Sequence, residues 1–374
     1  MQKITEGVTL HAPESRADSL RANDREWAKT SIFVSVFLLT ALGLSSADYL
    51  FVRLVDPYGD FGTGRFPIVL LDSRREKMEL FRRPGVASHV TGLVLGSSRS
   101  MLLKPQLLDT EFGERFFNFA VDNGHVEDYL AVYRWVLRHG APLHMLVIGL
   151  DVVAMHPDNI RDHMFELNDA LRSCLDDPSP TYAGPFHAAF LDSLQRLKEP
   201  FTAEYLKDSV KSIAIAFRNT RPTRGFEPDG YEDGARSGTP ISRATIDLDQ
   251  PIAADQVATY IDRFKGMNEL SAKRTGYLNT LVAESRARGI RTVIWLTPVH
   301  PRLMLAIEST TNHPHLVQLT RQYLKELHEQ FGAIVYDFSD IRSFGGTATD
   351  WTDNTHMTAE NMNRVALSLR RESR

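Results

Sequence analysis

The segment VTGLVLGSSRSML, residues 90–102, is the clearest indication of the fold of this chain. Its apolar run ends at Leu95 and breaks at Gly96, after which hydroxyl side chains and Arg99 follow. A short apolar run closed by a turn residue is typical of a buried parallel strand. Ser98 therefore falls where a strand gives way to a helix, at the edge where open α/β sheets bind their ligands. Backbone amides and the positive end of a helix dipole favour a nucleophilic serine there. The alternative is an ordinary serine N-cap.

Further apolar runs have the length and composition of strands, and they cover residues 116–121, 145–150, 292–297 and 333–338. Segments with apolar residues at helical spacing follow them, over residues 126–137, about 264–288, 315–331 and 358–371. In the last segment the apolar residues should face the sheet, namely Met362, Val365, Ala366 and Leu369. Strands that alternate with amphipathic helices form a parallel sheet covered on both faces. We therefore predict a flavodoxin-like, three-layer α/β/α sandwich with about five parallel strands.

The bulk composition suits a folded domain and argues against several classes of protein. Of the 374 residues, 43% are apolar and 24% are charged, as in ordinary globular domains. The formal net charge of -4 lacks the basic excess of a nucleic-acid-binding protein. The single cysteine, Cys174, excludes an internal disulfide and a cysteine-based metal site. No histidines occur at a typical metal-ligand spacing, so we expect neither a metal nor another cofactor.

An uncharged apolar segment precedes the predicted domain. Residues 30–47 carry no charge, and apolar residues continue to Val52, which is the length that a membrane-spanning helix needs. Three basic residues shortly before the segment favour a cytoplasmic N-terminus. A cleavable signal peptide is the alternative, because Ser45 and Ala47 form a weak cleavage site. The preceding segment is, however, far longer than the basic region of such signals.

These observations divide the chain into four parts. We expect a flexible cytoplasmic tail over residues 1–29 and a transmembrane anchor over residues 30–52. Residues 53–88 should form a connector, with a turn and a basic helix whose charged face is solvated. Residues 89–374 should form the domain outside the cytoplasm, with an insertion at about residues 157–263 that is part helical and part mobile.

Two residues far downstream are candidates for activating Ser98. A hydroxyl nucleophile needs a base within hydrogen-bond reach, and that base needs an orienting partner. Histidine suits proton transfer near neutral pH, so His356 is the candidate base, and Asp353 on the same predicted loop can orient its ring. Asn123–Gly124 and Asp151 follow the second and third strands and should lie at the same sheet edge. The alternative for the downstream pair is a plain surface loop before a helix.

With these residues, the chain resembles the SGNH hydrolase superfamily over roughly residues 91–371. Gly96–Ser98 is similar to the first block of the family, whose serine is the nucleophile, and Asp353–His356 to the block that supplies acid and base. Gly124 is similar to the glycine whose amide helps to hold the oxyanion. The third block differs, because Asp151 stands where the family has an asparagine donor. An ionised carboxylate would repel an oxyanion.

Neutralisation of Asp151 would remove this conflict. Arg99 directly follows the candidate nucleophile, and Asp151 ends a neighbouring strand, so we expect their side chains to meet beneath the pocket. A forked guanidinium suits a carboxylate. In that case Asp151→Asn should retain activity, because asparagine restores the donor of the family. The alternative is that Arg99 points to solvent or to an acidic residue of the insertion.

Within the superfamily, the anchor, connector and first block resemble membrane-anchored envelope acyl-transfer proteins, such as the lipoteichoic-acid D-alanylation protein and the alginate-type O-acetyltransferases. The resemblance implies a single-pass protein of the bacterial inner membrane with an extracytoplasmic catalytic domain. It also implies a glycan substrate and a multi-spanning, membrane-bound O-acyltransferase as partner. One alternative is a plain esterase with water as acceptor. Another is a non-catalytic scaffold that binds glycan or the membrane partner.

Overall fold

The computed structural model describes residues 14–58, 63–67, 72–157, 168–176, 203–217, 225–232 and 246–371, together with residues 69 and 165. Within these residues, five strands form one parallel sheet in the order β2-β1-β3-β4-β5. The strands are β1 (Gly92–Leu95), β2 (Phe116–Asn118), β3 (Met145–Leu150), β4 (Arg291–Leu296) and β5 (Ile334–Asp337). Every ladder is parallel, so the carboxyl ends of the strands lie at one edge of the sheet. The predicted α/β class with five parallel strands is confirmed.

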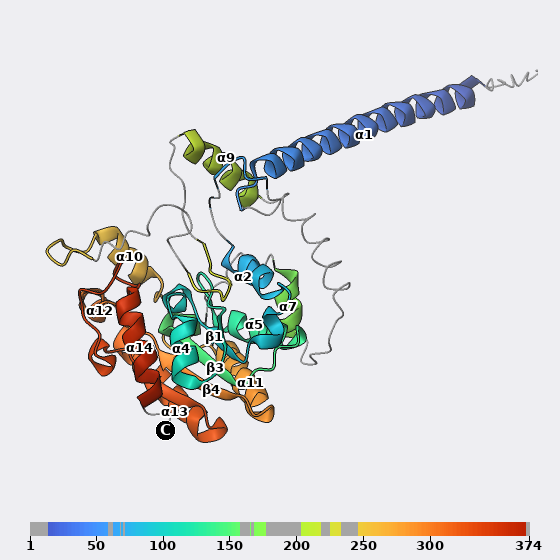
Figure 1. Cartoon of the computed structure of the whole chain (residues 1–374). Helices are drawn as coiled ribbons and strands as arrows, with labels where there is room; N and C mark the ends of the chain where they lie inside the picture. Colours follow the sequence, from blue (N-terminus) through green and yellow to red (C-terminus); the bar gives the residue numbers. More distant parts are fainter. Residues whose placement is uncertain are drawn as a thin grey trace, which may run out of the picture.

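Helices cover both faces of the sheet (Figure 1). Side chains of β1 alternate between two apolar cores, with Leu93 and Leu95 in one and Val94 in the other. The first core is closed by α5 (Val126–Arg138), α11 (Ala272–Ala287) and α13 (His313–Phe331). The second is closed by α4 (Pro105–Phe112) and α14 (Ala359–Arg371). The apolar face predicted for the last helix is buried in this second core, including Met362, Val365, Ala366 and Leu369.

Several short helices were not predicted from the sequence. They are α3 (Val86–His89), α4 and α12 (Pro301–Glu308), and the 3-10 helices over Val152–Met155 and Ile341–Phe344. The helix expected after β1 is present as a 3-10 helix of three residues, Ser98–Ser100. Proline occupies the first turn of α4 and of α12. Its fixed φ and missing amide hydrogen suit that position. These prolines were the available signal, because helices of eight residues show little periodicity.

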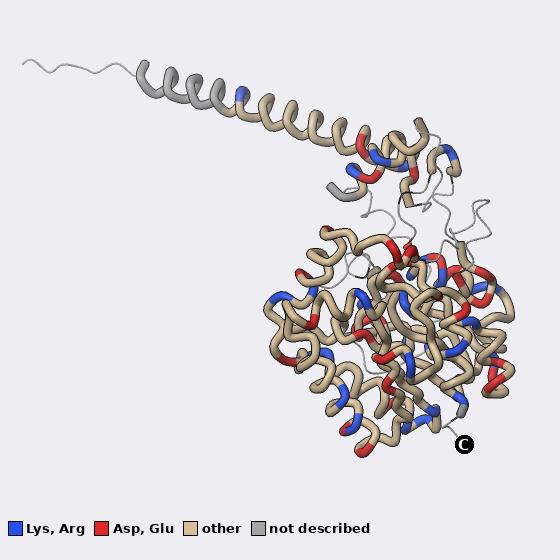
Figure 2. The backbone as a smooth tube through the Cα atoms, turned by 90° about the vertical axis from the view of Figure 1, so that its left-hand side faces the viewer, with Lys and Arg blue, Asp and Glu red and all other residues tan. Residues whose placement is uncertain are grey.

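The N-terminal helix begins earlier than the sequence indicated. It is α1 (Glu14–Val55), so residues 14–29 of the predicted flexible tail are helical, and residues 1–13 lie outside the described residues. The apolar segment supplies the helix nucleus, and the good helix formers before it extend the helix at little cost. The part Lys29–Val55, 27 residues, is long and apolar enough to cross a membrane. This helix projects away from the domain (Figures 1 and 2).

The basic helix predicted as a solvated connector packs into the domain instead. It is α2 (Ser73–Phe81), and both Arg74 and Lys77 are buried. Arg74 forms hydrogen bonds of 2.7 and 3.0 Å with Asp128 of α5. Lys77 donates to the carbonyl of Ala120 at 2.6 Å. The expectation of a solvated face was wrong because these partners compensate the desolvation of the charges, and spacing within the helix does not reveal them.

The predicted insertion contains three described helices, α7 (Asp169–Asp176), α9 (Ala203–Phe217) and α10 (Ala254–Asp262). The first of these packs against α5. Phe226 and Glu232 form an isolated antiparallel bridge. Much of the segment predicted to be mobile lies outside the described residues.

The helix predicted over about residues 264–288 is shorter at its start. The helix in the structure, α11, begins at Ala272. The side chain of Ser271 caps it by accepting a hydrogen bond from a backbone amide. Gly266, between α10 and α11, has a φ of 78° and interrupts the helical conformation there. A left-handed glycine ends a helical turn at little cost, so one continuous helix does not form.

A partly buried carboxyl group on α2 predicts a pH-dependent stability. Burial, with Glu79 nearby, raises the pKa of Glu76 from 4.5 to about 7. Because the folded state holds this proton more tightly than the unfolded state, the associated stability is present below pH 4.5 and lost as the pH rises through 7. Above pH 7, Glu76→Gln should therefore raise the free energy of unfolding by about 1 kcal/mol, after allowance for partial exposure. The variant should accordingly unfold at a higher urea concentration than the wild type.

Unfolding of the full chain in urea at several pH values measures this effect. Glu360→Gln, at an exposed position of α14, is the matched control and should not shift the transition. An unchanged stability of Glu76→Gln above pH 7 would contradict the prediction. So would a gain that persists below pH 4.5.

Candidate active site

The turn after β1 presents Ser98 at the carboxyl edge of the sheet. Gly96 has a φ of 154°, and a Cβ atom there would collide with the side chain of Ser100. The hydroxyl of Ser97 accepts a hydrogen bond from the amide of Arg99 at 3.2 Å and caps the following 3-10 helix. This helix has only three residues. Its dipole is small, so the electrostatic benefit expected from a helix after Ser98 is not provided in that way.

The loop between β2 and α5 packs directly against this turn. A Cβ atom on Gly124 would lie 2.5 Å from the carbonyl oxygen of Gly96, so the close approach requires glycine. The buried side chain of Asn118, at the end of β2, donates hydrogen bonds of 2.8 to 3.1 Å to the carbonyls of Ser100, Met101 and Leu103. We did not predict a role for Asn118. An asparagine within the apolar run FFNFAV was the available signal, since a buried amide needs partners.

The carboxylate of Asp353 organises the loop before α14. One of its oxygens accepts hydrogen bonds from the amides of Thr355 and His356 at 2.7 and 2.8 Å. Its other oxygen lies 2.7 Å from Nδ1 of His356. Burial alone would raise the pKa of Asp353, but the hydrogen bonds and the charge of His356 hold it well below the ordinary value. Asp353 is therefore ionised near neutral pH and orients the imidazole ring.

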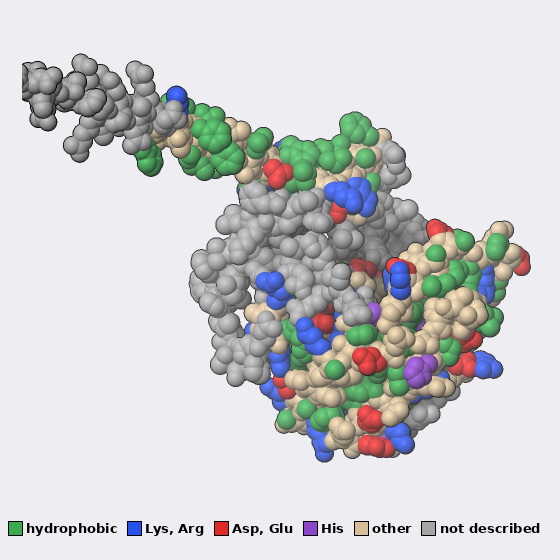
Figure 3. All heavy atoms as spheres, turned by 180° about the vertical axis from the view of Figure 1, so that it is seen from behind, with side chains coloured by type: hydrophobic (Ala, Val, Ile, Leu, Met, Phe, Trp, Pro, Cys, Tyr) green, Lys and Arg blue, Asp and Glu red, His purple; other side chains and the backbone are tan. Residues whose placement is uncertain are grey.

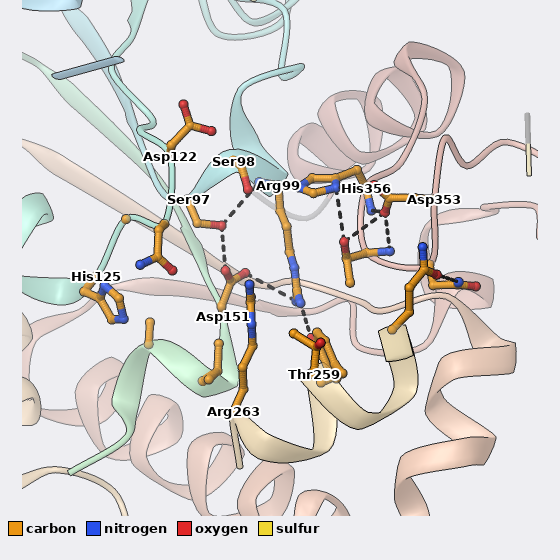
Figure 4. A pocket seen from close by; sticks show the side chains of 18 of the residues that line it. Ser97, Ser98, Arg99, Asp122, His125, Asp151, Thr259, Arg263, Asp353 and His356 are labelled. Atoms are coloured by element: carbon orange, nitrogen blue, oxygen red, sulfur yellow. Dashed lines mark hydrogen bonds and ion pairs between the residues drawn. The ribbon is translucent and has the colours of Figure 1, made fainter. Parts of the chain in front are cut away.

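Ser98, His356 and Asp353 lie in one row, although 258 positions separate the first two (Figure 4). Oγ of Ser98 lies 2.9 Å from Nε2 of His356. With Nδ1 engaged by Asp353, Nε2 is the nitrogen that can accept the serine proton. The three side chains line a pocket of about 500 Å³, a size that suits a small ligand or part of a polymer. The arrangement can support nucleophilic acyl transfer.

Arg99 and Asp151 meet beneath the pocket, but not as the forked pair that we expected. Nη1 of Arg99 lies 3.6 Å from the Asp151 carboxylate, beyond normal hydrogen-bond distance. The carboxylate accepts hydrogen bonds from the hydroxyls of Ser97, at 2.6 Å, and of Thr297. Arg99 donates to Thr297 at 3.3 Å and to the hydroxyl of Tyr260.

Both charges of this pair are shielded from solvent, since Arg99 is 8% exposed and Asp151 is 5% exposed. Burial disfavours the charged form of Arg99, but the Asp151 carboxylate and the hydrogen-bonded Tyr260 together outweigh it and raise the pKa of Arg99 above its ordinary value. Arg99 therefore does not point to solvent. Asp151 has a counter-charge and two hydroxyl donors, so it does not present an uncompensated charge to the pocket.

The expected oxyanion donors are only partly in place. The amide of Gly124 donates to the carbonyl of Val121 at 3.1 Å and is engaged within its own turn. Asn123, with φ of 48°, lines the pocket beside it. Among the described residues, the amide of Ser98 has no hydrogen-bond partner. The Ser98 amide and Asn123 are therefore the candidate donors.

One wall of the pocket comes from α10, inside the predicted insertion. Thr259, Tyr260 and Arg263 line the pocket from this side. Figure 4 shows Thr259 and Arg263 there. The side chain of Gln256 accepts a hydrogen bond of 2.8 Å from Asn354, on the loop that carries His356. We predicted none of these residues, because no sequence motif marks them. Only their position in the fold brings them to Ser98.

Within the described part of the chain, no group of three or more His, Cys, Asp or Glu side chains is placed to hold a metal ion. No protein-family model matches the sequence, and no curated protein matches it. The chemistry of the site is therefore inferred from its geometry and from the motif resemblance described above.

Proposed function

We propose that this chain is a membrane-anchored serine acyltransferase or esterase that acts on ester-linked acyl groups of a cell-envelope polysaccharide. The observation that carries the proposal is the distance of 2.9 Å between Ser98 Oγ and His356 Nε2, with Asp353 at 2.7 Å from Nδ1. These distances suit a nucleophile, its base and an orienting group. The strand order β2-β1-β3-β4-β5 supports a flavodoxin-like sandwich, because doubly wound sheets of that type share it.

In the proposed reaction, Oγ of Ser98 attacks the acyl carbonyl while Nε2 of His356 takes the serine proton. The ester C–O bond then breaks, and His356 returns the proton to the departing hydroxyl. The Ser98 amide and Asn123 would hold the negative charge on the carbonyl oxygen. An acceptor hydroxyl next attacks the acyl-serine and gives its proton to His356, which regenerates Ser98. The acceptor is water in hydrolysis and a sugar hydroxyl in transfer.

The polysaccharide substrate and the membrane partner in this proposal rest on the resemblance to SGNH envelope proteins. In that setting, a multi-spanning O-acyltransferase would bring acyl groups across the membrane, and this chain would act outside the cytoplasm. The proposed anchor is Lys29–Val55 of α1, at the inner membrane of a bacterium. A carboxylate without a counter-charge at position 151 would repel the oxyanion and favour the non-catalytic scaffold. Its compensation by Arg99 and two hydroxyls removes that argument.

A fluorophosphonate probe tests the proposed nucleophile directly. The full chain in detergent should be labelled at Ser98, and Ser98→Ala should abolish labelling. Ser100→Ala is the matched control, because the Ser100 hydroxyl is buried and has no hydrogen-bond partner among the described residues, so its removal costs little. A folded wild-type chain that resists the probe would favour the scaffold over either enzyme. If Ser98 is labelled, an aryl ester supplied together with a sugar separates the two reactions. Release of the free acid indicates hydrolysis, and formation of an acylated sugar indicates transfer.

The proposed topology predicts the location of the C-terminal domain. A reporter that is active only outside the cytoplasm, fused after Arg374, should be active in cells, and the chain should remain with membranes after alkaline washing. A fusion with a reporter active only in the cytoplasm is the control and should be inactive. A soluble mature chain that starts near Asp48 would instead show cleavage of a signal peptide.

A further inference from the structure

The helix α9 presents an apolar stripe that nothing in the described chain covers. Leu206, Val210 and Phe217 are 42%, 57% and 87% exposed. Their spacings of four and seven residues place them on one face of the helix. Scattered exposed apolar residues are common on proteins, but an aligned set on one helix face marks an interaction surface.

The neighbouring face of α9 is held by the segment that follows α1, so the stripe cannot turn inward. Tyr205 is buried against Val52 and Tyr58, with the tyrosine ring centres 4.5 Å apart. The hydroxyl of Tyr58 donates to Asp208 at 2.7 Å. The hydroxyl of Ser212 donates to the carbonyl of Pro67 at 2.5 Å.

These contacts place α9 at the end of the proposed membrane anchor. The helix lies beside the last turns of α1 and runs across that end rather than along it (Figure 1). Apolar side chains continue from α1 onto the segment at its end, with basic side chains beside them (Figure 3). A helix in this position meets the surface of any bilayer that α1 crosses.

The charge distribution of α9 suits a lipid surface. Lys207 and Lys211 are both exposed and lie one turn apart, beside the apolar stripe. Lysines next to an apolar stripe extend toward lipid headgroups and attract anionic lipids. A buried interface with another protein would instead be depleted of lysine. The bilayer is therefore the partner that this surface fits best.

We propose that α9 is an interfacial helix that lies in the membrane surface, with Leu206, Val210 and Phe217 inserted among the lipids and Lys207 and Lys211 at the headgroups. The proposal rests on the proposed membrane anchor, but not on the proposed chemistry. The domain would then have two membrane contacts, which restrict its rotation about α1. A single-pass anchor alone would leave that rotation free.

Depth-dependent fluorescence quenching tests this proposal with the full chain. An environment-sensitive dye is attached to Val210→Cys in a Cys174→Ala background, and the protein is reconstituted in vesicles of about three parts phosphatidylcholine to one part phosphatidylglycerol. Lipids brominated near the glycerol should quench this dye at least about twofold. Leu42→Cys, in the exposed apolar part of α1, should be quenched by lipids brominated deep in the acyl chains. Leu367→Cys, an exposed leucine on α14 away from α1, is the matched control and should not be quenched (Figure 1).

Each other outcome overturns the proposal in a distinguishable way. Quenching at position 42 without quenching at position 210 would leave the anchor intact and exclude the interfacial helix. Absence of quenching at both positions would exclude the anchor and the helix together. A dye at position 210 that is shielded from aqueous iodide, but not quenched by lipid, would identify a second copy of this chain as the occupant. Fluorophosphonate labelling in detergent does not depend on lipid, so it reports on the proposed enzyme separately.

Discussion

Replacement of Ser98 or His356 by alanine is expected to lower the rate of ester hydrolysis by about three to six orders of magnitude. Ser98→Ala removes the attacking oxygen, and His356→Ala removes the group 2.9 Å away that accepts its proton. Because the two residues act in the same step, the double variant should be no slower than the slower single variant. Steady-state hydrolysis of an aryl acetate by the full chain in detergent measures kcat and KM for all three.

Two control variants separate this effect from general damage to the fold. Ser100→Ala changes the same kind of side chain two residues away, and His315→Ala changes an exposed histidine at the start of α13. Both should retain the wild-type kcat/KM. Additive losses in the double variant would show that the two residues act independently. Activity near the wild-type level in Ser98→Ala would end the nucleophile hypothesis.

Arg99→Met is expected to lower the free energy of unfolding by about 3–5 kcal/mol, because it leaves the Asp151 carboxylate buried without its counter-charge. Asp151→Asn should also destabilise, because it leaves the Arg99 charge unpaired. The carboxylate also accepts hydrogen bonds from the hydroxyls of Ser97 and Thr297 beneath the turn, so it contributes to the structure of the turn. The SGNH resemblance predicts that asparagine at position 151 retains activity, which the hydrolysis assay measures separately from stability.

The double variant Arg99→Met with Asp151→Asn distinguishes a charge effect from lost packing. Removal of both charges should recover a large part of the loss, because no unpaired ion then remains buried. Urea unfolding, followed through the fluorescence of the buried Trp135, Trp295 and Trp351, measures all four members of the cycle. The loss in the double variant should be smaller than the sum of the losses in the two single variants. Additive losses would mean that the two charges do not interact. Arg321→Met, at a surface ion pair with Asp337, is the matched control and should cost at most about 1 kcal/mol.

Local patterns were sufficient for most of the sheet and of the covering helices. The five strands predicted to begin near residues 90, 116, 145, 292 and 333 all form. An apolar run and the turn that closes it lie within a few residues of each other, so the sequence pattern identifies them. The spacing of apolar residues from Met362 to Leu369 was enough to identify the buried face of α14. The order of strands and loops along the chain placed Ser98 and His356 at the same sheet edge.

Local patterns failed at several charged and polar side chains whose partners are distant in the sequence. The basic helix α2 was expected to face solvent, but Arg74 pairs with Asp128, 54 positions away. The site residues that sequence analysis missed, including Asn118, Thr297 and those of α10, make their contacts across the sheet edge. Conversely, residues 14–29 were expected to be flexible but continue α1, since helix extension depends on the apolar segment that follows.

Sequence patterns were enough to identify the α/β class, the apolar N-terminal segment and the candidate residues Ser98, Asp353 and His356. Each rests on periodicity or on a motif of a few residues. The packing of distant segments was needed to bring the Ser98 and His356 side chains to 2.9 Å and to bury the charges of Arg99 and Asp151 together. The free-energy cost of burying a polar group depends on the donors, acceptors and charges around it. Those groups come from segments up to 258 positions apart and become neighbours only when the sheet forms.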